Sequence, residues 1–144
     1  MLKVGVQLFG LLCRLVVSSM KKILFIEDEM RLHKNFEDLF KTEDFELISS
    51  YDGESGLRLA EETTPNLILL DLILPRKNGF EVLKEIKSNP RLAHIPVIIL
   101  TNVGGIQDIE RALSLGAHAY LEKANCSLDD ILEKIKETLK KYEH

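Results

Sequence analysis

The amino-acid sequence predicts a doubly wound α/β domain, in which helices cover both faces of a five-stranded parallel sheet. Beyond residue 21, five short apolar runs alternate with segments in which apolar residues recur every three or four positions. Such an alternation is typical of strand–helix–strand units with parallel strands. The chain of 144 residues has no long Gly-, Ser- or Pro-rich linker and no internal repeat after that point, so we expect a single domain.

Each apolar run is expected to be a buried strand, because it is short and bounded by polar or turn-forming residues. The runs lie at about residues 22–27, 45–49, 66–70, 96–100 and 118–122. Right-handed crossovers bring the carboxyl ends of such strands together at one edge of the sheet. We expect the flavodoxin-like strand order 2-1-3-4-5, which gives a (βα)5 three-layer sandwich.

The helices are expected from apolar residues that share one face of each segment. From the first helix to the last, these residues are Leu32, Phe36, Leu39 and Phe40; Leu57 and Ala60; Phe80, Leu83 and Ile86; Ile109, Ala112, Leu113 and Leu115; and Leu128, Ile131, Leu132, Ile135 and Leu139. Asp52 and Ser127 are expected N-caps, because their side chains accept hydrogen bonds from free backbone N–H groups. Gly116 is expected to end the fourth helix.

The first 19 residues form an apolar extension that fits no targeting signal. Lys3, Gln7 and Arg14 interrupt it, whereas a membrane span needs about 20 predominantly apolar residues, and no convincing cleavage site of a secretory signal follows. Because Met20 directly precedes the first strand, we interpret 1–19 as a dispensable or upstream-translated extension of uncertain role, and 20–144 as the domain. The alternative is a helix that lies on a membrane or a partner; secretion is the least favoured interpretation.

Charge and cysteine content argue against several functions. The formal net charge of −4 speaks against nucleic acid as a partner, and no helix-turn-helix sequence follows the last helix. Cys13 and Cys126 show neither metal-ligand spacing nor a disulfide framework, so a cytoplasmic location is expected. The histidines, at positions 33, 94, 118 and 144, lack the short spacing of a zinc site and are expected to be surface or packing residues.

Polar side chains follow four of the expected strands at their carboxyl ends. Glu27 and Asp28 follow the first strand and Asp71 follows the third. Thr101 follows the fourth strand and Lys123 the fifth. In doubly wound sheets, ligands bind beyond these strand ends, where the strand order reverses. Each residue alone also fits a polar turn, a helix cap or a solvated rim charge, but their shared position predicts one site.

The residue types at this expected site fit phosphoryl chemistry on a carboxylate. Three close carboxylates raise one another's pKa unless a cation lies among them, and Mg²⁺ prefers such oxygen ligands together with phosphate. Asp71 can then accept a phosphoryl group and form an acyl phosphate. The Lys123 ammonium and the Thr101 hydroxyl suit the phosphoryl oxygens, because phosphoryl transfer depends on positioning and charge neutralisation.

Over residues 21–142 the chain closely resembles the receiver domain of two-component response regulators, of the single-domain chemotaxis type. The resemblance rests on residues 23–29, on residues 69–75 with Gly79, on residues 96–101, and on residues 116–123. It implies a phosphoacceptor protein that catalyses no reaction beyond its own phosphorylation and dephosphorylation. The phosphodonor would be a sensor histidine kinase or a histidine phosphotransfer protein, and the output would be a downstream protein target.

The resemblance also implies a role for each site residue. Asp71 would be phosphorylated, with Mg²⁺ bound directly by Asp28 and Asp71, through water by Glu27, and by the backbone carbonyl of Ile73. Thr101 and Lys123 would contact the phosphoryl group. Thr101 and Tyr120 would form the coupled switch, in which the hydroxyl moves toward the phosphoryl group and the ring rotates inward. The switch would change the surface formed by the fourth helix, the fifth strand and the fifth helix.

Three departures from the family pattern bear on this function. Ala124 stands where the family usually has a proline after the lysine, and Asn102 is larger than the usual residue after the threonine. Ile73 and Val103 are apolar where many relatives carry polar side chains, so we expect slow loss of the phosphoryl group. One alternative is a pseudo-receiver that binds proteins without phosphorylation. Another is a metal-dependent phosphatase, but such enzymes commonly need a second acid where Ile73 stands.

Overall fold

The computed structural model describes residues 20–102 and 104–143, and these contain a five-stranded parallel sheet. The strands are β1 (Lys21–Ile26), β2 (Phe45–Ser50), β3 (Leu67–Leu70), β4 (Val97–Thr101) and β5 (Ala119–Glu122). They are arranged in the order β2-β1-β3-β4-β5, and every neighbouring pair is parallel. The predicted α/β class and the flavodoxin-like order 2-1-3-4-5 are therefore confirmed.

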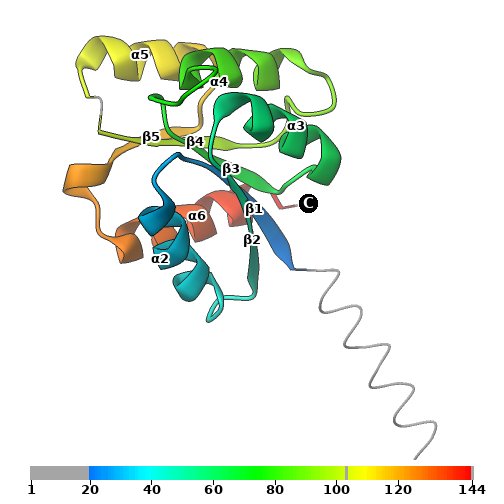
Figure 1. Ribbon diagram of the computed structural model, residues 1–144, viewed down its shortest axis with the longest axis vertical. Helices are drawn as coiled ribbons and strands as arrows, with labels where there is room; N and C mark the ends of the chain where they lie inside the picture. Colours follow the sequence, from blue (N-terminus) through cyan, green and yellow to red (C-terminus); the bar gives the residue numbers. More distant parts are fainter. Residues whose placement is uncertain (1–19, 103, 144) are drawn as a thin grey trace, which may run out of the picture.

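Helices cover both faces of this sheet and complete the three layers (Figure 1). They are α2 (Met30–Phe40), α3 (Gly53–Thr63), α4 (Gly79–Ser88), α5 (Ile106–Ser114) and α6 (Leu128–Lys141), with a short 3₁₀ helix η1 (Lys123–Asn125) after β5. Buried residues of α3, α4 and α5 form one apolar cluster with the sheet, and those of α2 and α6 form a second. The two clusters are separated by the sheet itself.

The apolar runs are continuous because the central strands are buried on both faces. Leu24 and Ile26 point toward α3–α5, whereas Ile23 and Phe25 point toward α2 and α6. All four side chains are completely buried. A parallel sheet between two helical layers requires this pattern, since alternate side chains of a strand enter opposite cores.

The expected helix ends are confirmed. The Asp52 side chain accepts a hydrogen bond of 2.8 Å from the backbone N–H of Ser55. Ser127 and Asp130 form a reciprocal capping box at the start of α6. Gly116, with a φ of 108°, lies just beyond α5 in the left-handed region that favours glycine.

The expectation that Leu113 faces the core was wrong. Leu113 of α5 is 45% exposed, and Ala112 is the buried residue of that helix. The reason is the position of α5 beside β5, an outer strand whose four residues are themselves only partly buried. A helix at this margin buries a narrower stripe than one over the centre of the sheet.

Two sequence interpretations lie outside the described residues. The first concerns the extension 1–19, and the second concerns Val103. Within the part of the chain that is described, the helices are too short and too polar for any of them to cross a bilayer.

Candidate functional site

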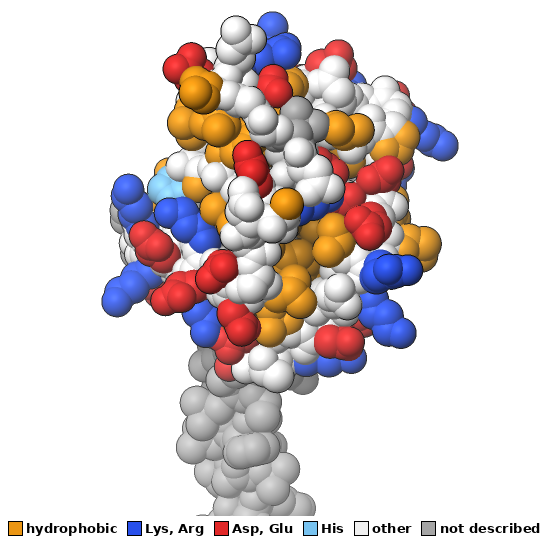
Figure 2. All heavy atoms as spheres, turned by 90° about the vertical axis from the view of Figure 1, so that its left-hand side faces the viewer, with side chains coloured by type: hydrophobic (Ala, Val, Ile, Leu, Met, Phe, Trp, Pro, Cys, Tyr) orange, Lys and Arg blue, Asp and Glu red, His pale blue; other side chains and the backbone are white. Residues whose placement is uncertain are grey.

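The carboxyl ends of the parallel strands meet at one edge of the sheet, on the left in Figure 1. Ile26 of β1 pairs with Leu70 of β3, so the next residues, Glu27 and Asp71, leave adjacent strands at the same level. On the space-filling view of this side, acidic and apolar side chains lie close together (Figure 2). The strand register alone therefore brings acidic groups 44 positions apart in the sequence into one site.

Three carboxylates form the centre of this site. One oxygen each from Glu27, Asp28 and Asp71 lies within 4.8 Å of the others. Glu27 is 1% exposed and Asp71 is 5% exposed, whereas Asp28 faces solvent. Burial, together with the charge of Asp71, raises the pKa of Glu27 to about 7, against the hydrogen bond from Lys123. Carboxylates crowded and buried in this way favour binding of a cation.

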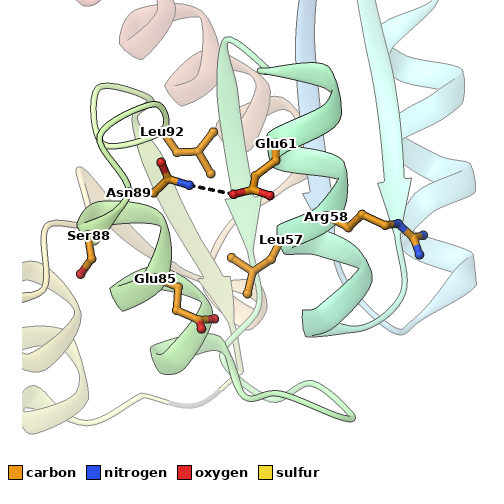
Figure 3. A pocket seen from close by; sticks show the side chains of 7 residues that line it. All are labelled: Leu57, Arg58, Glu61, Glu85, Ser88, Asn89 and Leu92. Atoms are coloured by element: carbon orange, nitrogen blue, oxygen red, sulfur yellow. Dashed lines mark hydrogen bonds between the residues drawn. The ribbon is translucent and has the colours of Figure 1, made fainter.

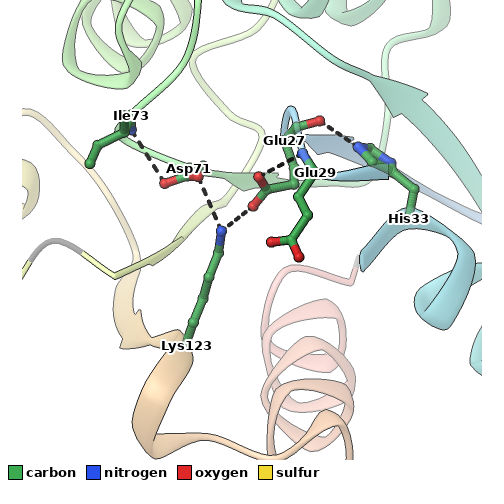
Figure 4. Close-up of polar contacts among 6 residues, drawn as sticks. All are labelled: Glu27, Glu29, His33, Asp71, Ile73 and Lys123. Atoms are coloured by element: carbon green, nitrogen blue, oxygen red, sulfur yellow. Dashed lines mark hydrogen bonds and ion pairs between the residues drawn. The ribbon is translucent and has the colours of Figure 1, made fainter. Parts of the chain in front are cut away.

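Lys123 reaches both buried carboxylates from the start of η1 (Figure 4). Its Nζ lies 3.1 Å from Oδ2 of Asp71 and forms a second ion pair with Oε1 of Glu27. Burial acts to lower the pKa of Lys123, but the hydrogen bond with Glu27 and the charge of Asp71 outweigh it and raise this pKa. The ammonium therefore stays charged and partly balances the acidic cluster.

The loop after β3 holds Asp71 in place through its backbone. The N–H of Ile73 donates to Oδ1 of Asp71 at 3.3 Å, while the Ile73 side chain is 61% exposed. Gly79 begins α4 so close to this loop that an added Cβ would lie 2.2 Å from the backbone oxygen of Asp71. Only glycine fits there, and it allows the helix to pack directly beneath Asp71.

The expected switch pair lies on β4 and β5. Thr101 is completely buried at the carboxyl end of β4, and Tyr120 is half-buried against the α3–α5 cluster. Tyr120 pairs with Ile99, which is two residues before Thr101, so Tyr120 and Thr101 face the same side of the sheet. Burial raises the pKa of Tyr120, which keeps its hydroxyl neutral.

The departures from the family pattern leave this geometry intact. No cis peptide bond occurs in residues 20–102 or 104–143, and Ala124 lies within η1. Lys123 reaches both acids all the same. Asn102 is exposed after β4, so its effect on access to the site stays a prediction.

His33 is a site neighbour that the sequence did not reveal. As expected it is a packing residue, 4% exposed on the inner side of α2. It also bonds the backbone oxygen of Glu27 through Nε2, at 2.6 Å. A single histidine on the apolar face of a helix has no motif that would indicate this contact.

A groove between α3 and α4 lies apart from the acidic site (Figure 3). The Asn89 amide donates to Glu61 across it, at 2.9 Å. None of the predicted site residues lines this groove.

Relatives of known family share this sequence pattern. The sequence model of the response regulator receiver domain matches residues 23–136. Over 119 residues, the chain is 38% identical to the polar-differentiation response regulator DivK of Brucella anthropi. That alignment covers 83% of this chain and 96% of the relative.

Solved structures share the fold as well. A CheY-like response regulator receiver domain protein from Methanospirillum hungatei JF-1 matches with a TM-score of 0.81 and 29% identity, over 87% of this chain and 98% of that one. The Mn²⁺-bound form of response regulator Rcp1 matches with a TM-score of 0.70 and 37% identity, over 81% and 90%. The chain therefore belongs to the response regulator receiver domain family, the signalling modules of two-component systems that are phosphorylated on aspartate.

Proposed function

We propose that Asp71 is the phosphoacceptor of this receiver domain and that Glu27, Asp28, Thr101 and Lys123 serve the reaction around it. The observation that carries the proposal is a cluster of three carboxylates with oxygens within 4.8 Å of one another. Two of them, Glu27 and Asp71, also form ion pairs with the half-buried Lys123. Asp71 is the member of this cluster that lies at the centre of the sheet edge, directly after β3.

The donor set fits a divalent cation such as Mg²⁺, which prefers oxygen ligands. Asp28 and Asp71 would bind it directly, Glu27 through water, and Ile73 through its backbone carbonyl. When bound, the cation supplies positive charge that neutralises phosphoryl oxygens. The raised pKa of Glu27 supports this assignment, because the lysine alone does not offset the burial of the acidic groups.

In the proposed reaction, a carboxylate oxygen of Asp71 attacks the phosphorus of a phosphohistidine. The new O–P bond forms as the N–P bond breaks, and the donor imidazole takes up a proton. Lys123, 3.1 Å from Oδ2, offsets the charge that gathers on the phosphoryl oxygens, and the Thr101 hydroxyl donates to one of them. The protein thus catalyses only its own phosphorylation and, with water, its own dephosphorylation.

Receiver domains interact with histidine kinases or phosphotransfer proteins, and we propose that the apolar rim of the site receives that phosphodonor. Met30 is 70% exposed, Ile73 is 61% exposed and Ile106 is 75% exposed. They lie in segments that follow β1, β3 and β4, around the acidic cluster. Large apolar side chains exposed around a polar site are typical of a docking surface.

For the output, we propose that Thr101 and Tyr120 transmit phosphorylation to a surface formed by α5, β5 and α6. Their common face of the sheet supports a coupled movement. A protein target would bind this surface. The site of action would be the cytoplasm, as expected from a sequence whose two cysteines show no pattern of a disulfide framework.

Intact mass measurement after incubation with a small phosphodonor tests this function. We expect the wild type to gain the mass of one phosphoryl group only when Mg²⁺ is present, and Asp71→Asn to gain none. Absence of a gain in the wild type would contradict the proposal and favour the pseudo-receiver alternative. Glu37→Gln, an exposed acid on α2, is the control and should gain the phosphoryl group normally.

A further inference from the structure

His33 is the buried polar side chain of α2, and its ring points at the backbone of Glu27 (Figure 4). Its Nε2 lies 2.6 Å from the backbone oxygen of Glu27, and its Nδ1 lies 2.9 Å from Oγ of Ser49. Because His33 belongs to α2 and Ser49 to β2, the ring connects the loop to two elements of the fold.

The partners of the ring determine which nitrogen carries the proton. A backbone carbonyl oxygen only accepts hydrogen bonds, so Nε2 of His33 must carry the hydrogen that it donates to Glu27. In the neutral ring Nδ1 is then an acceptor, and the Ser49 hydroxyl donates to it. Both ring nitrogens are satisfied in this one tautomer.

The carbonyl that His33 holds belongs to the peptide bond between Glu27 and Asp28. This bond is planar, so fixing its oxygen fixes the orientation of the whole unit that joins two of the three clustered carboxylates. On the other side of the same residue, the Glu27 N–H donates to the backbone oxygen of Ser50 at 2.9 Å. The backbone of Glu27 is therefore held at both its N–H and its carbonyl.

Aromatic neighbours hold the imidazole itself in place. The Phe25 ring centroid lies 4.6 Å from that of His33 on one side, and the Tyr51 centroid lies 4.5 Å away. Such contacts restrict rotation of the ring, so its hydrogen bond to the Glu27 carbonyl is fixed in direction before any ligand arrives.

We propose that His33 is a positioning residue that raises the affinity of the Glu27–Asp28 segment for a divalent cation, by orienting the peptide unit between the two acids. This inference rests on the cation site of the proposed function. Groups that orient metal ligands without touching the metal commonly change metal affinity by about 10–100-fold.

Titration of the metal-free protein with Mg²⁺ or Mn²⁺ by calorimetry tests the proposal. His33→Phe keeps a ring of similar size but donates no hydrogen bond, and we expect its dissociation constant to rise at least about 10-fold. His33→Gln places an amide N–H near the position of Nε2 and should stay within about 3-fold of the wild type. A dissociation constant for His33→Phe within about 2-fold of the wild type would overturn the proposal.

Phe36→Leu is the matched control, since Phe36 is a buried ring on the same face of α2 and also contacts Phe25. It should lower the melting temperature without changing metal affinity, whereas a general loosening of the core would weaken binding in both variants. Should His33→Phe fail to fold, Ser49→Ala decides the question. It removes the hydrogen bond to Nδ1, and we expect metal affinity to fall about 2- to 10-fold, the equivalent of one net hydrogen bond; an unchanged affinity would contradict the proposal.

Imidazole ¹⁵N NMR of the wild type gives a readout that needs no variant. We expect the Nε2–H tautomer of His33 with a slowly exchanging proton, and the Nδ1–H tautomer would overturn the inference. The outcomes also separate this inference from the proposed function. If the wild type binds no cation, the cation site itself is refuted; if it binds and His33→Phe binds equally well, only the role of His33 is refuted.

Discussion

Two half-buried lysines at opposite edges of the same sheet make different kinds of contact. At the amino edge, Lys87 of α4 donates to the backbone oxygens of Ala93 and Ile95, at 3.1 and 2.7 Å. At the carboxyl edge, Lys123 pairs with the carboxylates of Glu27 and Asp71. Burial lowers the pKa of Lys87, whereas the acidic partners of Lys123 outweigh burial and raise its pKa.

The two edges of the sheet use charge differently. Lys87 donates hydrogen bonds to neutral carbonyl oxygens and holds the segment before β4 against α4. Its hydrogen bonds are therefore complete without any ligand. Lys123 faces more negative charge than it can balance, since Glu27, Asp28 and Asp71 lie together. Unbalanced charge at a buried position reduces stability. We propose that a divalent cation and a phosphoryl group compensate this charge at the carboxyl edge.

Removing the Lys123 ammonium should have the largest effect on function. Lys123→Met leaves two buried carboxylates without their cationic partner. It also removes the ammonium that we propose offsets the charge on the phosphoryl oxygens. We expect the rate of phosphorylation by a small phosphodonor to fall at least about 100-fold, measured by intact mass against time. Lys136→Met, which removes an ion pair between α6 and Glu43, is the control and should leave the rate unchanged. An unchanged phosphorylation rate in Lys123→Met would show that this lysine does not serve the reaction.

Gly79→Ala should have the largest effect on stability. The new Cβ would lie 2.2 Å from the Asp71 backbone oxygen, so α4 and the loop must move apart. We expect a loss of about 3 kcal/mol in the free energy of unfolding in urea, together with slower phosphorylation. Gly105→Ala is the matched control, because its Cβ meets no atom within 4 Å. Equal losses in the two variants would show that Gly79 is not required beneath the site.

Lys87→Met should reduce stability but not phosphorylation. The substitution leaves the oxygens of Ala93 and Ile95 without their donor, which should cost about 1–2 kcal/mol in urea unfolding. Lys84→Met, at an exposed position of the same helix, should change stability by less than about 0.5 kcal/mol. A drop in the phosphorylation rate of Lys87→Met would show that the two edges are not independent.

Ile73→Asn should have the smallest effect, on the lifetime of the phosphorylated state. The apolar Ile73 side chain has no group that orients water beside Asp71, whereas an amide has. We expect dephosphorylation about 2- to 10-fold faster than in the wild type, the equivalent of one net hydrogen bond, followed as loss of phosphoprotein over time. Leu113→Asn controls for the loss of an exposed apolar side chain. An unchanged dephosphorylation rate in Ile73→Asn would show that the apolar side chain of Ile73 does not slow the loss of the phosphoryl group.

The sequence predicted most of the fold because each local signal agreed with the others. The buried runs became strands, and the caps at Asp52 and Ser127 and the stop at Gly116 lie where they were expected. The convergence of Glu27, Asp28, Asp71 and Lys123 followed from one rule of parallel sheets. The roles of these residues stay proposals.

The features that the sequence did not predict depend on where a helix lies in the fold, and the spacing of apolar residues does not indicate that position. Leu113 fits the apolar stripe of α5, but the helix lies at a margin where that position is exposed. His33 and Lys87 each occupy helix positions that suit ordinary packing or solvent. Their partners are backbone oxygens of Glu27, Ala93 and Ile95 in loops, and the positions of these loops follow only from the folded structure.

Whether Asp71 is the phosphoacceptor can be decided by locating the phosphoryl group within the chain. After phosphorylation, borohydride reduction converts a phosphoaspartate to homoserine, which tandem mass spectrometry identifies at one position. We expect homoserine at position 71 when Mg²⁺ is present and unmodified aspartate when the metal is chelated. Homoserine at position 28 instead, or modification that does not depend on the metal, would contradict it.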